Sequence, residues 1–167
     1  GKLDLIASCV GSSVVSVLLN DGKGKFTLVN SPSDLSGPDL SLVITGDFNG
    51  DGKVDAIISS KTREQLYFLA GEGNGSFKSP AALSKQALGE IYSLTSVDLN
   101  NDGKIDLVSG TDGPFGLFVM LGEGSGKFNA PLFSGVGGWP GSADSHVSQQ
   151  RRDMGHPGSS HFTRPSS

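Results

Sequence analysis

Apolar residues occur in short runs along most of the chain, separated by segments rich in Gly, Asp, Asn and Ser. The runs are rich in Val, Ile, Leu and Phe, which is typical of β-strands. No stretch repeats its apolar residues with the helical period over the length of a helix. The sequence therefore predicts an all-β chain, with strands at residues 2–8, 14–19, 42–45, 54–59, 65–70, 93–97, 105–109 and 117–121.

A nine-residue acidic segment recurs within this pattern. Residues 47–55 read DFNGDGKVD, and residues 98–106, at an offset of 51 positions, read DLNNDGKID. Residues 1–4, GKLD, match the end of the same motif one further offset back. A period of about 50 residues is typical of propellers, solenoids and other repeat arrays.

A glycine-rich hairpin recurs at the same offset and ends each time in phenylalanine, at Phe26, Phe77 and Phe128. We expect these three rings to pack between neighbouring sheets. Each repeat then consists of four short strands of one antiparallel sheet. The acidic segment joins the first strand to the second, and the hairpin leads into the fourth.

The acidic segment has the composition of a calcium loop. Its positions 1, 3, 5 and 9 carry side-chain oxygens, and position 6 is Gly, where a sharp turn requires a positive φ. Three carboxylates in one tight loop repel each other unless a cation lies between them, and Ca²⁺ accepts six to eight oxygen ligands. The lysine at position 7 would offer its backbone carbonyl. The predicted ligands are Asp47, Asn49, Asp51, Lys53 and Asp55 in one loop, and Asp98, Asn100, Asp102, Lys104 and Asp106 in the other.

Two other interpretations of the acidic segment are possible. An EF-hand requires a glutamate at position 12 and flanking helices, but position 12 is Ile58 or Ser109 and the flanks are strand-like. Alternatively, Asn-Gly and Asp-Gly simply form hairpin turns. Turns alone do not require Asp at positions 1, 5 and 9 of both copies, so the calcium interpretation is favoured.

Composition and charge exclude several function classes. The formal net charge is −4 and the repeats have no basic face, which argues against nucleic acid as a partner. No apolar run approaches the length of a membrane span. The repeats contain no histidine and no Gly-x-Ser-x-Gly motif, so we assign no catalytic residues and do not expect an enzyme.

The motif DFNGDGKVD, followed by an apolar strand and later by GEGNGSF, resembles the FG-GAP/VCBS repeat family. The resemblance implies antiparallel four-stranded blades of an integrin-α-like β-propeller, here about two and a half blades of a partial propeller. It also implies Ca²⁺ bound through positions 1, 3, 5, 7 and 9 of each complete loop. The first repeat keeps only Lys2 and Asp4 of its loop, so we expect its calcium site to be lost.

By this resemblance, residues 1–134 form the propeller repeats. Residues 135–167 are rich in Ser, Gly, Pro, His and Arg and poor in apolar residues, so we expect a low-complexity, disordered tail there. The repeats divide into a truncated blade at 1–30 and blades at 39–80 and 91–133. The truncated first motif indicates a fragment of a longer chain, whose remaining blades would be partners. The tail is either a natural disordered segment or an out-of-frame translation of a fourth repeat.

The expected function is that of a calcium-binding module for adhesion or for binding an extracellular protein or glycan, on a secreted or surface protein. The alternative is an accessory propeller of a carbohydrate-active enzyme, a lyase or a lectin-like protein, whose catalytic residues lie outside this chain. A third hypothesis is a truncated product without a function of its own.

Overall fold

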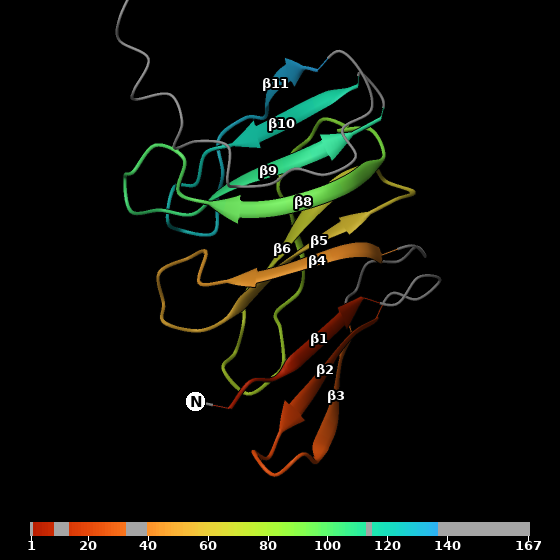
Figure 1. The fold of residues 1–167 in the computed structure, drawn as a ribbon, viewed down its shortest axis with the longest axis vertical. Coiled ribbons are helices and arrows are strands. Elements are labelled where there is room, and N and C mark those ends of the chain that lie inside the picture. Colours follow the sequence, from red (N-terminus) through yellow and green to blue (C-terminus); the bar gives the residue numbers. More distant parts are fainter. Residues whose placement is uncertain (1, 9–13, 33–39, 113–114, 137–167) are drawn as a thin grey trace, which may run out of the picture.

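The described residues of this computed structural model, 2–8, 14–32, 40–112 and 115–136, form three antiparallel sheets and no helix. The sheets follow one another along the long axis of the molecule (Figure 1). The prediction of an all-β chain built from partial propeller blades is confirmed, and the sheets do not close into a ring. The predicted tail from residue 137 onward lies outside the described residues.

The strands run through the sheets in chain order. The first sheet contains β1 (Leu5–Ser8), β2 (Val14–Asn20) and β3 (Phe26–Pro32). The second contains β4 (Leu40–Gly46), β5 (Asp55–Ser60), β6 (Gln65–Leu69) and β7 (Ala81–Ala82). The third contains β8 (Ile91–Val97), β9 (Asp106–Thr111), β10 (Gly116–Met120) and β11 (Leu132–Gly135).

The repeat is visible in the strand register. In β4 the pairing with β5 shifts between Leu40 and Val43, and in β8 the pairing with β9 shifts at the matching place, between Ile91 and Ser93. Because Asp4 precedes Asp55 by 51 positions, β1 corresponds to β5. The described part of the first sheet therefore contains no counterpart of β4.

The two hydrophobic clusters lie on either side of β5. Ile57 belongs to a cluster shared with Leu107 of the third sheet, whereas Ala56 and Ile58 belong to one shared with Val15 of the first sheet. Alternate residues of a strand face opposite sides of its sheet, so β5 supplies both clusters. Every residue of β5 is accordingly buried.

The repeated phenylalanines differ in their surroundings. Phe128 of the third sheet lies with its ring centroid 6.3 Å from that of Phe48, in the loop after β4, and Phe77 packs against the cluster between the first and second sheets. Phe26 is 41% exposed, so the prediction that all three rings pack between sheets is wrong for this one. No described sheet lies on the side of the first sheet where Phe26 would find its contact.

The hairpins end differently from the sequence-based expectation. Phe77 and Phe128 form isolated bridges with Gly71 and Gly122 and do not begin the fourth strands directly. β7 and β11 begin further along, at Ala81 and Leu132. The fourth strand is thus a short outer edge, while the three preceding strands of each complete sheet carry the core.

Replacing Ile57 by alanine tests the double-sided packing of β5. The side chain is fully buried, so Ile57→Ala should lower the free energy of unfolding by about 2–5 kcal/mol. Leu132→Ala is the control, because Leu132 is 62% exposed on β11 and should change stability by no more than about 0.5 kcal/mol. Urea unfolding measures both, and equal losses would contradict the described core.

Candidate metal-binding loops

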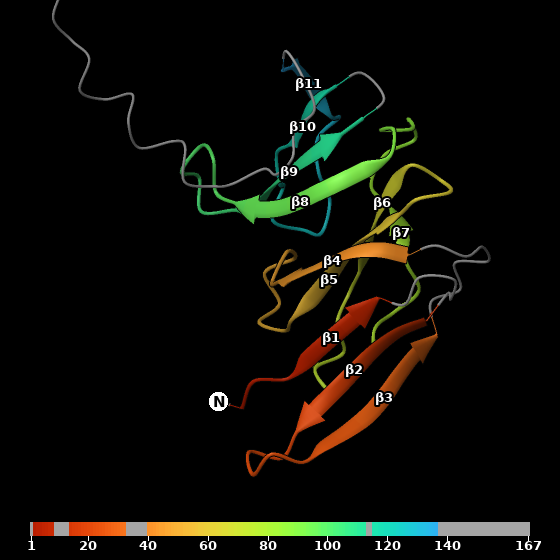
Figure 2. The ribbon, with the colours of Figure 1, turned by 45° about the vertical axis from the view of Figure 1, so that its right-hand side comes forward.

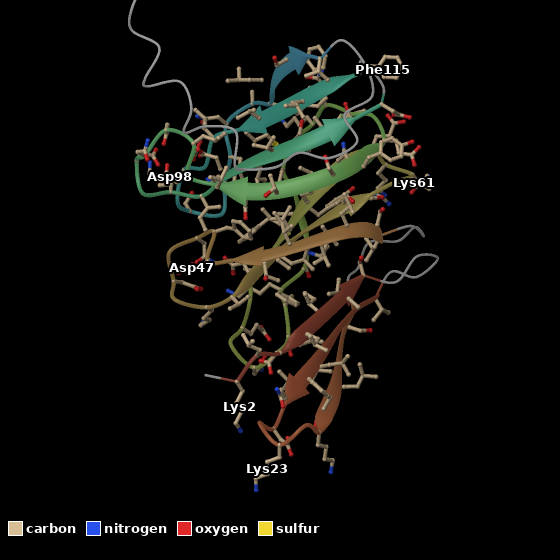
Figure 3. The ribbon with its side chains drawn as sticks, in the orientation of Figure 1. Lys2, Lys23, Asp47, Lys61, Asp98 and Phe115 are labelled. Carbon is tan, nitrogen blue, oxygen red and sulfur yellow. The ribbon has the colours of Figure 1, made fainter. Side chains whose placement is uncertain are left out.

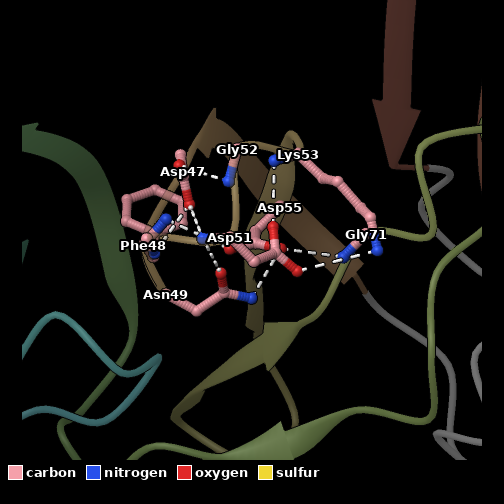
Figure 4. A network of polar contacts seen from close by, with 9 residues as sticks. Asp47, Phe48, Asn49, Asp51, Gly52, Lys53, Asp55 and Gly71 are labelled. Atoms are coloured by element: carbon pink, nitrogen blue, oxygen red, sulfur yellow. Dashed lines mark hydrogen bonds and ion pairs between the residues drawn. The ribbon is translucent and has the colours of Figure 1, made fainter.

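The first residue of each acidic loop organises the turn through its carboxylate. Asp47 Oδ1 accepts the N–H groups of Gly50 at 2.7 Å and Asp51 at 3.1 Å, and Asp47 Oδ2 accepts that of Gly52 at 2.9 Å (Figure 4). Asp98 repeats two of these bonds, at 3.1 Å and 2.9 Å. The aspartate at position 1 therefore folds the loop around itself, whatever else it binds.

The turn depends on left-handed backbone at two positions. Position 6 has φ of 79° at Gly52 and 82° at Gly103, as the sequence predicts. Position 4 also lies in the left-handed region, with φ of 75° at Gly50 and 59° at Asn101. Gly and Asn are the residues that adopt this conformation at least cost, which explains why the two copies differ at this position without a change of fold.

The aspartate at position 9 connects the loop to the following hairpin. Asp55 Oδ1 accepts the N–H of Gly71 at 2.8 Å, and its Oδ2 accepts that of Phe48 at 3.1 Å. Asp106 makes the same two bonds, to Gly122 at 2.8 Å and Leu99 at 2.9 Å. Both carboxylates are fully buried, and hydrogen bonds from N–H groups compensate for the loss of water around them.

Two glycines that were not predicted as functional residues allow the aspartate at position 9 to reach the hairpin. A Cβ at Gly71 would lie 2.0 Å from the carbonyl oxygen of Val54, and a Cβ at Gly122 would lie 2.1 Å from that of Ile105. The recurrence of both glycines at the repeat offset was the signal available in the sequence. In the first repeat the position is Asn20, which still donates its N–H to Asp4, at 2.8 Å.

The carboxylates of the first complete loop interact electrostatically. Burial raises the pKa of Asp55 above its ordinary value, the N–H groups of Gly71 and Phe48 oppose this, and the charges of Asp51 and Asp47 raise the pKa further. In the second loop, the N–H of Lys104 is the main cause that holds the pKa of Asp102 below its ordinary value. The charges of Asp51 and Asp47 therefore act on Asp55 within the same loop.

The asparagine at position 3 lies among these carboxylates. Asn49 Nδ2 donates to Asp55 Oδ1 at 3.3 Å, whereas Asn100 Nδ2 donates to Asp102 Oδ2 at 3.2 Å. The oxygen of each amide accepts the N–H of the residue at position 5, at 2.8 Å and 3.0 Å. The amide group thus has a different acidic partner in each loop.

The lysines at position 7 point along the loop surface. Lys53 Nζ lies 3.9 Å from Asp51 Oδ2, and Lys104 Nζ lies 3.8 Å from Asp102 Oδ2. These side chains are about half exposed, so each pair contributes at most about 1 kcal/mol. Their aliphatic stems lie close to Gly73 and Gly124 of the hairpins.

The oxygen-rich donor set fits a hard cation in its chemistry, because carboxylate, amide and carbonyl oxygens are the ligands that Ca²⁺ prefers. Within the described ranges, however, no three His, Cys, Asp or Glu side chains are gathered closely enough to hold a metal ion by themselves. The structure brings positions 1, 3, 5 and 9 into one loop, and backbone N–H groups occupy part of their acceptor capacity. Binding through these residues requires the asparagine amide and a backbone carbonyl as well.

The acidic loop of the second sheet is also held by the third sheet. Gly126 donates its N–H to the carbonyl oxygen of Phe48 at 3.0 Å, next to the contact between Phe48 and Phe128. Leu99, the counterpart of Phe48 in the third sheet, is 39% exposed, whereas Phe48 is 3% exposed. The junction between the second and third sheets therefore joins the acidic loop of one repeat to the hairpin of the next.

A polar cluster joins the second and third sheets on the opposite side of the molecule from the two loops (Figure 3). Lys61 Nζ lies 2.5 Å from Glu90 Oε1, and the Tyr92 hydroxyl donates to Asp112 Oδ2 at 3.1 Å. The hydrogen bond from Lys61 lowers the pKa of Glu90. Desolvation, followed by its contacts with Glu90 and Asp112, raises the pKa of Tyr92 to about 12.

The antiparallel sheets, their register and the repeated loops define a β-propeller-like repeat module. The FG-GAP-like repeat model matches residues 1–58 and 47–109, which together cover more than half of the chain. The chain belongs to the FG-GAP-like repeat family. A search of the curated proteins found no match. Among the described residues, no helix is long and apolar enough to cross a membrane.

Gly71→Ala tests the close approach between the hairpin after β6 and the end of the acidic loop. The added methyl group would collide with a backbone carbonyl, so we expect a loss of unfolding free energy of about 3 kcal/mol. Gly135→Ala is the matched control, because its Cβ would meet nothing closer than 3.8 Å. Denaturant unfolding compares the two variants. A Gly71→Ala protein as stable as the control would contradict the described close approach of the two backbone segments.

Proposed function

We propose that the chain is a calcium-binding recognition module that acts outside the cell and binds an extracellular protein or a glycan. The observation that supports it is the recurrence of the same oxygen-bearing residues, at positions 1, 3, 5 and 9, in two loops with nearly the same backbone geometry. The proposed ligands are Asp47, Asn49, Asp51, Asp55 and the carbonyl of Lys53, and their counterparts Asp98, Asn100, Asp102, Asp106 and the carbonyl of Lys104.

Calcium would act first on stability. A cation between Asp47, Asp51 and Asp55 would relieve their mutual repulsion. Each loop is attached to a buried aspartate and, in the second sheet, to the hairpin of the next sheet. An ion in the loop would therefore stabilise the strands on both sides and the junction between sheets, so metal binding would be coupled to folding.

The two loops lie on the same side of the molecule (Figure 3), so bound calcium would order one continuous surface. Exposed loops on a rigid scaffold are the usual position of binding residues. We propose that this loop surface carries recognition, and that the module itself is not an enzyme. Its proposed location outside the cell rests on the family resemblance alone.

Thermal unfolding of the chain in Ca²⁺, in Mg²⁺ and in chelator, at fixed ionic strength, tests whether the acidic loops bind calcium. A loop that binds only when folded gains about 2.7 kcal/mol at a calcium concentration of 100 times its Kd. Asp51→Ala and Asp102→Ala should each remove part of the calcium-dependent increase in Tm, and the double variant should remove all of it. A transition that responds equally to both ions, or to neither, rejects calcium binding.

Asp21→Ala is the matched control for the loop variants. Asp21 lies in a hairpin outside the acidic loops and accepts the N–H groups of Lys23 at 2.7 Å and Lys25 at 3.1 Å. Its replacement removes one negative charge and the same kind of local hydrogen bond. It should change Tm without changing the calcium-dependent increase.

The recognition role has its own test. The chain, in calcium or in chelator, is applied to a glycan array and to immobilised extracellular-matrix proteins. Binding that requires calcium and is lost in the Asp51→Ala, Asp102→Ala double variant supports the proposal and distinguishes a glycan from a protein ligand. A chain that responds to calcium in unfolding but binds neither set of probes contradicts the recognition role alone.

A further inference from the structure

We propose that Asn74 is an acceptor site for an N-linked glycan, and this rests on the proposed location of the module outside the cell. The acceptor motif is Asn-x-Ser or Asn-x-Thr, with any residue except proline at x. Asn74-Gly75-Ser76 is its one occurrence in the chain, because no other asparagine has Ser or Thr two positions later. The motif lies in the hairpin between β6 and β7, which Figure 2 shows extending from the second sheet towards β1.

The amide nitrogen of Asn74 is available for attachment. Its Oδ1 accepts the N–H of Ser76 at 2.9 Å, which is the turn that asparagine forms with the residue two positions later. Within the described part of the chain, its Nδ2 makes no hydrogen bond. The corresponding nitrogens of Asn49 and Asn100 donate to carboxylates, and that of Asn20 donates to a backbone carbonyl. A glycan on Nδ2 of Asn74 therefore replaces no contact of the hairpin.

The same hairpin position is exposed in all three repeats. It is held by Lys23, Asn74 and Ser125, at the offset of 51 positions, and each of these residues is exposed. Ser125 is the informative one, because its neighbour Gly126 is buried and donates its N–H to the carbonyl of Phe48 at 3.0 Å. The position thus stays open to solvent even where the acidic loop of the adjacent sheet lies against the hairpin.

The geometry of the motif depends on local bonds. The bond from Ser76 to Asn74 spans two positions, and the N–H of Glu72 reaches the carbonyl of Ser76 at 2.9 Å, over four positions. Such bonds form without the rest of the sheet. The hairpin can therefore present Asn74 to a glycosyl transferase before the sheets assemble, and it remains exposed afterwards.

The transfer is a substitution at a sugar carbon. The donor is an oligosaccharide joined through a diphosphate to a lipid. A bond forms between Asn74 Nδ2 and the anomeric carbon, while the bond from that carbon to the diphosphate oxygen breaks. The amide gives up one proton to the transferase, and the lipid diphosphate leaves with the electron pair of the broken bond.

The glycan would stand beside only one of the two acidic loops. A Cβ at Gly73, next to Asn74, would lie 3.4 Å from Cδ of Lys53 at position 7 of the loop in the second sheet. The matching segment in the third sheet, Ser125-Gly126-Lys127, is not an acceptor motif. A bulky polar glycan would therefore flank the loop at 47–55 and leave the loop at 98–106 open.

Expression of the full chain behind a cleavable secretion signal in cultured eukaryotic cells tests the site. Chain is purified from both the medium and the cells, so that poor export does not hide the modification. Intact mass should show a glycan that peptide N-glycosidase removes. Digestion in water labelled with heavy oxygen should then place the resulting aspartate, with its added label, at residue 74.

Three variants define the acceptor. Asn74→Gln and Ser76→Ala should each abolish the glycan, whereas Ser76→Thr keeps the motif and should retain it. In the Asn74→Gln chain, the pair Ser125→Asn and Lys127→Ser moves the motif to the third hairpin, and we expect a glycan there. Its absence would contradict the argument from the shared hairpin geometry.

The glycosylated chain and the same chain after enzymatic removal of the glycan should unfold cooperatively with equal Tm. Chain without a glycan at Asn74 overturns the proposal, as does a glycosylated chain that unfolds cooperatively only after the glycan is removed. The calcium and recognition tests use chain made without a secretory pathway, which carries no glycan. Their failure is therefore read separately from the failure of the glycan site.

Discussion

The buried aspartate at position 9 is the group on which the rest of each repeat depends. One carboxylate oxygen of Asp55 binds the N–H of the loop and the other binds that of the hairpin, so two segments 23 positions apart, Phe48 and Gly71, share a single side chain. A buried charge is costly without such donors. The carboxylate therefore holds the start of the acidic loop and the start of the hairpin on one side chain, which helps to set the register of β5 and β6 between them.

Phe48, whose N–H binds this aspartate, also connects the second sheet to the third. The N–H of Phe48 binds Asp55 within the second sheet, while its carbonyl accepts Gly126 and its ring contacts Phe128 of the third. A cation bound by the loop would act on this same point. Hairpin geometry, packing between sheets and the proposed metal binding would thus all depend on one short segment rather than on separate regions.

Local sequence patterns predicted the strands and the loop turns well, because both depend on nearby residues. Short apolar runs rich in strand-forming residues predicted β5 and β9, and Gly52 and Gly103 adopt the positive φ expected of them. The role of Gly71 was not predicted, because the collision that excludes a Cβ involves Val54, which lies 17 positions earlier, at the end of the acidic loop before β5. The exposure of Phe26 was missed for a similar reason, since it depends on which sheet lies beside it.

The burial of β5 on both faces has a consequence for how the molecule opens. In a stack of repeats, stability is approximately the sum of the units and of the contacts between nearest neighbours. The second sheet takes part in both junctions, whereas the first and third sheets each take part in one among the described residues. Fluctuations should therefore begin at the two ends of the stack and reach the centre last. The amide hydrogens of β5 would exchange only through the rarest openings, and those of β3 and β11 through the most frequent.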